Sequence, residues 1–376
     1  MRILHLTHTD LRYDNRILKE IEALSEINIY NVNAIGVELN EKAAYAKRNF
    51  NSRIKNIKLF TSKFKALPRP FLYLLNLIEI TLVFLINSIK VKPQIIHCHD
   101  TMVLPVGVII KIIFKSKLIY DAHELESNKN GQSYILSRAT YLVEKLFWNR
   151  IDHFITVSQS ILNWYSSAFG NKPSTLILNS PIINPRDSQS TSDYFHKLYK
   201  IPNESIVFVY IGFLGFGRSI ENVIEVFLNK EIHSHVVFIG YGDLYDYIFS
   251  YQSKVSNIHL HDAIAHDDVV NILNSADIAF CLIENVSLSD YYCLPNKLFE
   301  YIFAGVPIIA SDFPDISALV NKYNLGQVCT LDLSSILSAV KDIQLNPPKR
   351  ITTDLADLTW SSQARKLKLI YESLSI

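Results

Sequence analysis

The sequence places a lysine and a glutamate three residues apart at the start of an expected helix. Lys297 and Glu300 belong to the stretch 293–312, in which Pro295 suits the first turn of a helix because its missing N–H is not needed there. Gly305 ends this helix, and the apolar run after it has the composition of a buried parallel strand. An ammonium and a carboxylate beside free backbone N–H groups suit a phosphate and a sugar hydroxyl. A surface ion pair on an ordinary helix is the alternative.

A second candidate is the glycine-rich loop 212–217, which follows an apolar strand-like run. Gly215 and Gly217 let the backbone approach a ligand closely, and a helix is expected directly after them. Arg218, at the start of that helix, offers a forked cation for phosphate oxygens. The loop is neither a P-loop nor a Gly-x-Gly-x-x-Gly fingerprint, so its interpretation depends on Lys297. Two cations, each at a helix start, could clasp a diphosphate.

Polar side chains follow three expected strands in the first half of the chain. The clusters are Thr7–Arg16 with Asp14 and Arg16, His97–Thr101 with His99 and Asp100, and Tyr120–Glu124 with His123. Each also has a structural interpretation, because Asp14 or Asp100 could cap a helix and His97 could be a core histidine. The pair His97 and His99 lacks clear third and fourth ligands, so we expect no metal. Three clusters at strand ends of one sheet favour a functional site.

The first half alternates strand-like and helix-like runs, which is typical of a doubly wound parallel sheet. Strands are expected at about 3–7, 29–37, 57–61, 94–98, 117–120, 153–157 and 176–178, and helices at about 16–24, 71–89, 101–115, 133–149 and 159–168. A polar, proline-bearing stretch follows. We therefore predict a first domain over 1–185 and a linker over 186–204.

A second α/β series predicts another domain over 205–358, and the tail 359–376 reads as a last amphipathic helix. Strands are expected at about 206–212, 236–240, 257–260, 277–282 and 307–310, and helices at about 219–229, 243–252, 267–275, 295–304 and 333–343. Ligands of such sheets collect at the carboxyl ends of the strands, so we expect the site in a crevice between the domains.

Composition limits the class of protein. A chain of 376 residues is long enough for two domains, and its net charge of +1 argues against a nucleic-acid binder. Its four cysteines lack metal-ligand or disulfide spacing, which favours buried thiols in a reducing compartment. No signal peptide precedes the first strand-like run, so the cytoplasm is the expected location.

The segment 71–89 is nearly long enough to span a bilayer. Glu79 lies at its middle, and an acidic side chain there would cost about 2.5–3.5 kcal/mol on insertion scales. We therefore favour a long, mostly buried helix packed on a sheet. The alternative is a helix resting on an anionic membrane surface, because Lys63, Lys65 and Arg69 precede it.

Several sequence blocks together resemble a known family. They are Asp121–Glu124, Ile155–Ser158, Leu178–Pro181, Tyr210–Gly212, Phe238–Gly242 and Leu294–Ser311. Their order and spacing resemble the glycosyltransferases of GT-B fold, specifically the retaining family 4 of bacterial surface-polysaccharide enzymes. The resemblance covers essentially the whole chain. It implies two Rossmann-like domains facing across a cleft, with the last helix crossing back onto the first domain.

In that family the nucleotide-sugar lies against the second domain. The resemblance assigns Arg218 and Lys297 to the donor diphosphate and Glu300 to the ribose hydroxyls. Gly215, Gly217 and Leu298 are the other nucleotide contacts that it implies.

The same resemblance assigns roles in the first domain. His123 matches the histidine that contacts the transferred sugar, and it completes the expected catalytic set with Arg218 and Lys297. Asp14 and Arg16 fall in a loop that covers the reaction centre. They are expected to meet acceptor or donor sugar, as are His99, Asp100 and Tyr292.

One position departs from the family pattern. The family often shows a glutamate, seven residues and a second glutamate, but Tyr292 stands at the first position. The sugar-facing carboxylate is thus missing, and Ser289, Asp290 and Tyr291 are the neighbours that could supply substitute contacts.

The resemblance implies transfer of a sugar, with retention, from a nucleotide-diphosphate sugar to a glycan or lipid-linked acceptor in surface-polysaccharide biosynthesis. Cations and helix N–H groups can stabilise the departing diphosphate, so no metal or other cofactor is expected. The protein is expected to be cytoplasmic, with peripheral contact with the inner membrane face, and to bind no nucleic acid. Two alternatives remain: a nucleotide-sugar epimerase of the same architecture, and a non-catalytic nucleotide-sugar-binding subunit, which Tyr292 makes conceivable.

Overall fold

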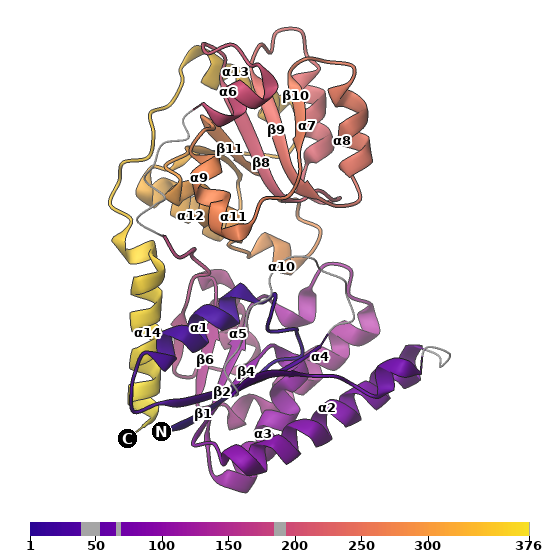
Figure 1. Ribbon diagram of the computed structural model, residues 1–376, viewed down its shortest axis with the longest axis vertical. Helices are drawn as coiled ribbons and strands as arrows, with labels where there is room; N and C mark the ends of the chain where they lie inside the picture. Colours follow the sequence, from indigo (N-terminus) through magenta and orange to yellow (C-terminus); the bar gives the residue numbers. More distant parts are fainter. Residues whose placement is uncertain (39–52, 65–68, 184–192, 376) are drawn as a thin grey trace. The chain divides into compact units, whose positions relative to one another are not determined.

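A computed structural model describes residues 1–38, 53–64, 69–183 and 193–375 of the chain. Two compact units form, one of Met1–Leu178 with Ser361–Ile376 and one of Asn179–Trp360. In each unit, helices pack against a parallel sheet (Figure 1). Lys65 and residues 186–192 of the expected linker lie outside the described residues.

The first unit has a seven-stranded sheet in the order β3-β2-β1-β4-β5-β6-β7. Its strands are β1 (Arg2–Leu6), β2 (Asn31–Val37), β3 (Ile54–Ile57), β4 (Ile95–His99), β5 (Lys117–Ala122), β6 (His153–Thr156) and β7 (Ser174–Leu176). Its helices are α1 (Asn15–Ser25), α2 (Arg69–Val91), α3 (Leu104–Phe114), α4 (Tyr134–Phe147), α5 (Gln159–Phe169) and α14 (Trp360–Leu374), with 3₁₀ turns η1 (Thr61–Lys63), η2 (Thr101–Val103), η3 (Glu126–Asn128) and η4 (Trp148–Arg150). Strand order reverses between β1 and β4, the switch point at which such sheets bind ligands.

The second unit has a six-stranded sheet in the order β10-β9-β8-β11-β12-β13, with its switch point between β8 and β11. Its strands are β8 (Val207–Phe213), β9 (His235–Tyr241), β10 (Ile258–His261), β11 (Ile278–Cys281), β12 (Ile308–Ser311) and β13 (Gly326–Cys329). Its helices are α6 (Tyr194–Tyr199), α7 (Ile220–Phe227), α8 (Tyr245–Gln252), α9 (Val269–Leu273), α10 (Leu288–Tyr291), α11 (Asn296–Phe303), α12 (Pro314–Tyr323) and α13 (Leu333–Leu345), with 3₁₀ turns η6 (His266–Asp268) and η7 (Ala356–Leu358). Phe208 and Phe280 stack at its core, and Phe227 packs edge-on against both.

The expected doubly wound α/β architecture is confirmed, and three local expectations are corrected. The strand expected at 57–61 is β3, which ends at Ile57 and is followed by η1. Helix α12 and strand β13 were missed, although Pro314 in the first turn of α12 was a usable signal. Gly326 opens β13 with φ +145°, and a Cβ there would lie 2.1 Å from the Ile308 carbonyl oxygen, so the strand requires glycine at this point.

The expectation that the helix at 71–89 is mostly buried is wrong. Helix α2 covers that segment, but only 17% of its apolar window Leu74–Val91 is buried. By length and composition this helix could cross a membrane, although core helices of soluble proteins pass the same test. Its outward side chains therefore need a separate explanation.

Candidate functional site

The loop between β8 and α7 lies at the switch point of the second sheet. Gly212 and Gly217 have φ angles of +127° and +78°, which residues with a Cβ rarely adopt. Ser219 immediately precedes α7, and Glu284 Oε1 accepts hydrogen bonds from its N–H at 2.9 Å and its Oγ at 3.1 Å. Because Glu284 lies just beyond β11, it ties this loop to the neighbouring strand end. Sequence reasoning missed Glu284, which carries no motif of its own.

Arg218 follows these glycines and stays partly exposed. Its Nη1 donates to Asp290 Oδ1 at 3.3 Å, and 30% of its side chain is exposed. Ser287 holds Asp290 in place, since its Oγ donates to Asp290 Oδ2 at 2.8 Å. A Cβ on Gly215 would lie 2.3 Å from the Phe213 ring, so a larger residue would displace that ring. A forked cation that one carboxylate orients but does not enclose can bind phosphate oxygens.

Lys297 carries a buried ammonium group in the first turn of α11. Its Nζ lies 3.9 Å from the centroid of the Tyr210 ring, and it has no hydrogen-bond partner among the described residues. Burial raises the pKa of the nearby Cys281 thiol to about 11, and Lys297 and Arg218 both act in the opposite direction. Both predicted cations therefore act electrostatically on the same buried thiol. A buried, unpaired ammonium is costly, and an anion is the ligand that would satisfy it.

The other residues predicted to contact the nucleotide have mixed surroundings. Glu300 shares α11 with Lys297, is 13% exposed, and lies 3.7 Å from His266 Nδ1. Leu298 has a fully buried side chain, and its N–H donates to the Pro295 carbonyl at 3.1 Å, so it contributes packing. Tyr292 is the C-cap residue of α10 and packs its ring against Tyr291, with the centroids 5.4 Å apart.

In the first unit, Arg16 and Asp121 form a buried ion pair at the switch point. Arg16 Nη2 lies 3.0 Å from Asp121 Oδ1, and Arg16 Nη1 donates to the Ile177 carbonyl at 2.9 Å. Although burial acts to raise it, Arg16 and His123 hold the pKa of Asp121 well below its usual range. Arg16 belongs to α1 and is 4% exposed, so the structure corrects its predicted place in a covering loop. Its guanidinium is engaged within the domain.

His123 lies between two carboxylates. Its Nε2 is 3.3 Å from Asp121 Oδ2 and its Nδ1 is 3.7 Å from Asp100 Oδ1. Burial acts to lower its pKa, but Asp100 and Asp121 outweigh this and raise the pKa to about 10. The ring is therefore an imidazolium at neutral pH, which can donate hydrogen bonds and stabilise negative charge but cannot act as a base.

Three buried histidines extend this cluster to the last helix. His5 Nδ1 lies 3.0 Å from His99 Nε2, and the Tyr371 hydroxyl lies 2.8 Å from His97 Nδ1 and 3.3 Å from His5 Nε2. Burial lowers the pKa of all three, that of His97 to about 3, so they are neutral at pH 7. His5 and Tyr371 were missed as network members, because only the fold brings residues so distant in sequence together.

The remaining predicted residues of the first unit have local roles. Asp14 caps α1, because its Oδ1 accepts from the Ile17 N–H at 3.1 Å. Asp100 follows β4 with a φ of +64° and faces His123, and His99 lies within the histidine network.

His5, Glu20, His97 and His99 have ligand atoms close enough to hold a metal ion. Arg16 Nε already lies 3.3 Å from Glu20 Oε1, and a dication would add positive charge beside this guanidinium and the His123 imidazolium. This positive charge disfavours a dication, although Glu20 Oε1, Glu20 Oε2 and His97 Nε2 have no hydrogen-bond partner among the described residues.

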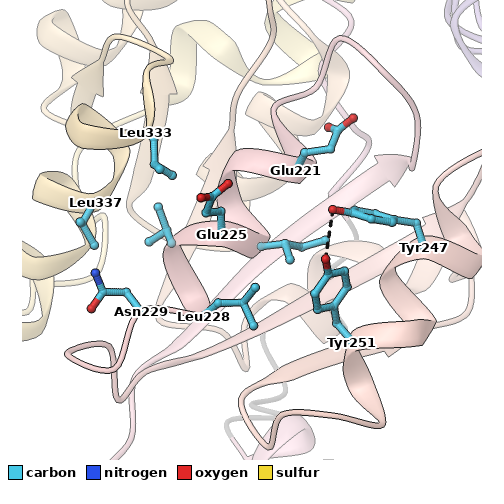
Figure 2. A pocket seen from close by; sticks show the side chains of 10 residues that line it. Glu221, Glu225, Leu228, Asn229, Tyr247, Tyr251, Leu333 and Leu337 are labelled. Atoms are coloured by element: carbon cyan, nitrogen blue, oxygen red, sulfur yellow. Dashed lines mark hydrogen bonds between the residues drawn. The ribbon is translucent and has the colours of Figure 1, made fainter.

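A cavity of about 520 Å³ lies elsewhere in the second unit, among α7, α8 and α13. Figure 2 shows Glu221 and Glu225 on its wall and a hydrogen bond, 3.4 Å long, between the Tyr247 and Tyr251 hydroxyls. No predicted site residue lines it, so the residues at the switch point, rather than this cavity, define the candidate site.

Known proteins resemble both halves of the chain. Residues 42–181 match Glycosyltransferase Family 4, and residues 206–343 match Glycosyl transferases group 1. An uncharacterized glycosyltransferase of Methanocaldococcus jannaschii is 24% identical over 241 residues, which are 61% of this chain. The match spans only 60% of that relative's length.

Two solved structures share the fold over essentially the whole chain. Sucrose-phosphate synthase from Thermosynechococcus elongatus has a TM-score of 0.79 at 16% identity, covering 100% of this chain and 99% of its own. Anabaena HepE in complex with UDP has a TM-score of 0.67 at 13% identity, covering 100% of both chains. With both halves matched by glycosyltransferase families and the two-sheet fold shared throughout, the chain belongs to the glycosyltransferases of GT-B fold and resembles their family 4.

Proposed function

We propose that this chain transfers a sugar, with retention of configuration, from a nucleotide-diphosphate sugar to a lipid-linked glycan acceptor in surface-polysaccharide biosynthesis. One observation carries the proposal: the buried Lys297 ammonium has no hydrogen-bond partner among the described residues and shares its surroundings with Arg218. A diphosphate would supply the negative charge that Lys297 lacks, and it can also accept hydrogen bonds from the exposed part of the Arg218 guanidinium, beside its pair with Asp290. The complex of HepE with UDP supports uridine diphosphate as the first nucleotide to test.

The chemistry follows from where charge develops. Glycosyl transfer passes through an oxocarbenium-like state while the nucleoside diphosphate departs with growing negative charge. Lys297 and Arg218 would stabilise that leaving group without moving, because α11 and the tied glycine loop already hold them. Retention through front-side attack needs no separate protein base. This suits His123, whose flanking carboxylates keep it charged.

We place the reaction in the cytoplasm at the inner membrane face, with a lipid-linked acceptor and no metal cofactor. The exposed apolar face of α2 supports a membrane-bound acceptor, since it would bring the enzyme to the lipid. The donor sugar is open, because Tyr292 occupies the position at which the family often has a carboxylate.

The test measures nucleoside diphosphate release from UDP-, GDP- and dTDP-sugars with a membrane extract as acceptor, with and without a chelator. Lys297→Ala and Arg218→Ala should each lower turnover of the accepted donor about 10²–10³-fold. The matched control is Lys254→Ala, which removes an exposed lysine over the Tyr251 ring (5.2 Å) and should retain turnover.

Wild-type-like turnover in both variants would defeat the proposal. Conversion of free donor without acceptor would indicate an epimerase, and binding without release would indicate a non-catalytic subunit. Strict loss of activity on chelation would refute the metal-independent clamp.

A further inference from the structure

Helix α2 has its apolar side turned away from the protein. Eight large apolar side chains on it are between 36% and 64% exposed: Phe71, Leu74, Leu75, Leu77, Ile78, Leu82, Ile86 and Ile89. Most of them recur at intervals of three or four residues, so they form one stripe along the helix. At 1.5 Å per residue the stripe is about 27 Å long. A stripe of this size on a solvent face marks an interaction surface.

Three polar residues of α2 face the protein instead. The Glu79 carboxylate accepts hydrogen bonds from the Phe60 and Thr61 N–H groups at 2.6 and 2.8 Å, beside η1. Asn87 Oδ1 accepts from Lys55 Nζ at 2.6 Å, and Ser88 is fully buried. The acidic residue that made a membrane contact unfavourable in the sequence is therefore engaged by the protein, away from the stripe.

Helices α3 and α4 extend this surface, because α3 packs against both α2 and α4. Figure 1 shows α2 and α3 side by side in the first unit. On α3, Ile109, Ile112 and Ile113 are exposed, and on α4 Ile135, Leu142 and Leu146 are 81%, 61% and 71% exposed. We call the exposed side chains of α2, α3 and α4 the three-helix face.

Charge on the three-helix face has one sign. Arg138 and Lys145 are exposed beside the apolar stripe of α4, and Lys90 is exposed at the end of α2. The three helices contain two carboxylates, and both are engaged by the protein: Glu79 as above, and Glu144, which is fully buried and bonded to Tyr120 and Tyr165. An apolar surface with a basic flank fits an anionic lipid headgroup layer.

The same charges disfavour a second copy of this chain. A two-fold contact through the three-helix face would bring the cations of one copy toward those of the other without a carboxylate between them. We propose that the three-helix face docks the first domain onto an anionic lipid bilayer, with α2 lying along the membrane surface. The purpose of this docking rests on the proposed function, since a lipid-linked acceptor is found there.

Co-sedimentation of the full chain with lipid vesicles tests the proposal. Vesicles of phosphatidylcholine with about 30% phosphatidylglycerol should bind the protein, and pure phosphatidylcholine vesicles should bind it weakly. Leu82→Glu/Ile86→Glu should weaken binding at least about tenfold, because two exposed anchors become acidic. Its matched control is Phe249→Glu/Leu345→Glu in the second unit, where the two side chains are 57% and 80% exposed, and binding should not change.

A second variant tests the contribution of charge by reversing the charges of Arg138 and Lys145 together. Arg138→Glu/Lys145→Glu should weaken binding to the anionic vesicles about 30-fold or more, at about fivefold per basic residue. The control Lys230→Glu/Lys254→Glu makes the same charge change at exposed sites of the second unit and should bind as the wild type.

Thermal stabilisation by UDP is measured on the same variants and should not change, because none lies in the second unit's switch point. The lipid-docking proposal is overturned if the wild type does not bind the vesicles, or if the variants bind them as well as the controls do. Either result would hold regardless of the thermal stabilisation by UDP. A concentration-dependent dimer that Leu82→Glu/Ile86→Glu dissolves would overturn it in favour of a second copy. If UDP does not raise the thermal stability of the wild type, that result would count against the proposed function instead.

Discussion

The two switch points differ in whether their buried charged side chains are paired within the protein. At the first, between β1 and β4, Arg16, Asp121 and His123 satisfy one another within the domain. At the second, between β8 and β11, Lys297 is buried with no hydrogen-bond partner among the described residues. The strands are ordered in the same way around both switch points, so the difference lies in the side chains. We call a site matched when its charged groups pair with one another, as at the first switch point, and such pairing stabilises the domain. The unmatched Lys297 ammonium at the second switch point is available to bind an anionic ligand.

Matched and unmatched buried charges differ in what their removal does to the free energy of unfolding. Removing one partner of a matched buried pair leaves an uncompensated charge and is strongly destabilising. Removing an unmatched buried cation relieves a desolvation penalty and costs only function. The following changes test this contrast, in order of decreasing expected effect.

Asp121→Asn should cause the largest loss of stability. It removes the carboxylate that Arg16 and His123 share, and we expect the free energy of unfolding to fall by about 3–5 kcal/mol in urea titrations. Asp152→Asn is the control in the same sheet, because Asp152 pairs with Lys111 at 2.5 Å but is 25% exposed. It should cost about 1 kcal/mol. Equal losses in the two variants would show that the first switch point is not specially matched.

Lys297→Met should break function while sparing the fold. The ammonium has no hydrogen-bond acceptor to lose in the part of the chain that the structure describes, and its contact with the Tyr210 ring is worth about 1–2 kcal/mol against a similar desolvation cost. We expect the free energy of unfolding to stay within about 1 kcal/mol of the wild type and UDP affinity to fall about 10²-fold. Denaturant titration and calorimetry measure the two. A stability loss as large as that of Asp121→Asn would mean that Lys297 is matched in the free protein.

Sequence reasoning reached the second switch point more readily than the first. Lys297 lies in a helix that a proline precedes, and Arg218 follows a glycine-rich loop, so a few neighbouring residues are enough to predict a role for each. The first switch point joins His5 and Tyr371, and no local pattern indicates a hydrogen bond across most of the chain. Motifs indicated that His123 matters but not that two carboxylates enclose it.

The fold was predictable for a similar reason, and so were its errors. Alternating strands and helices follow from local periodicity, which fixes the two sheets. Helix α2 was misjudged because apolar composition does not say whether the apolar side faces a sheet or the solvent. Strand β13 was missed because its sequence, Gly-Gln-Val-Cys, has little β-rich character and depends on pairing with β12.

His123→Gln should change how the free energy of unfolding depends on pH. The folded pKa of His123, about 10, lies above the ordinary 6.5, so its stabilisation is complete below pH 6.5 and is lost as pH rises towards 10. We expect the wild type to exceed His123→Gln by about 2 kcal/mol at pH 6.5, and the difference to vanish near pH 10. Urea titrations at several pH values measure it.

His153→Gln is the control with the opposite sign. Burial lowers the pKa of His153 to about 4, so its contribution is present above pH 6.5 and is lost as pH falls towards 4. A His123 difference that is flat between pH 6.5 and 10 would mean that Asp100 and Asp121 do not hold the ring charged.

Tyr371→Phe should have the smallest effect, and it asks whether the last helix is part of the matched network. Its hydroxyl is within hydrogen-bond distance of His97 Nδ1 and His5 Nε2, so the change leaves buried nitrogens with fewer partners and should cost about 1–2 kcal/mol of unfolding free energy. Lys368→Met, on the same helix, breaks only an exposed pair with Glu26 and should cost less than about 0.5 kcal/mol. UDP affinity should not change in either variant, because both lie in the first unit. If Tyr371→Phe costs no more than Lys368→Met, the helix is held by apolar packing alone, and the matched network ends at His97.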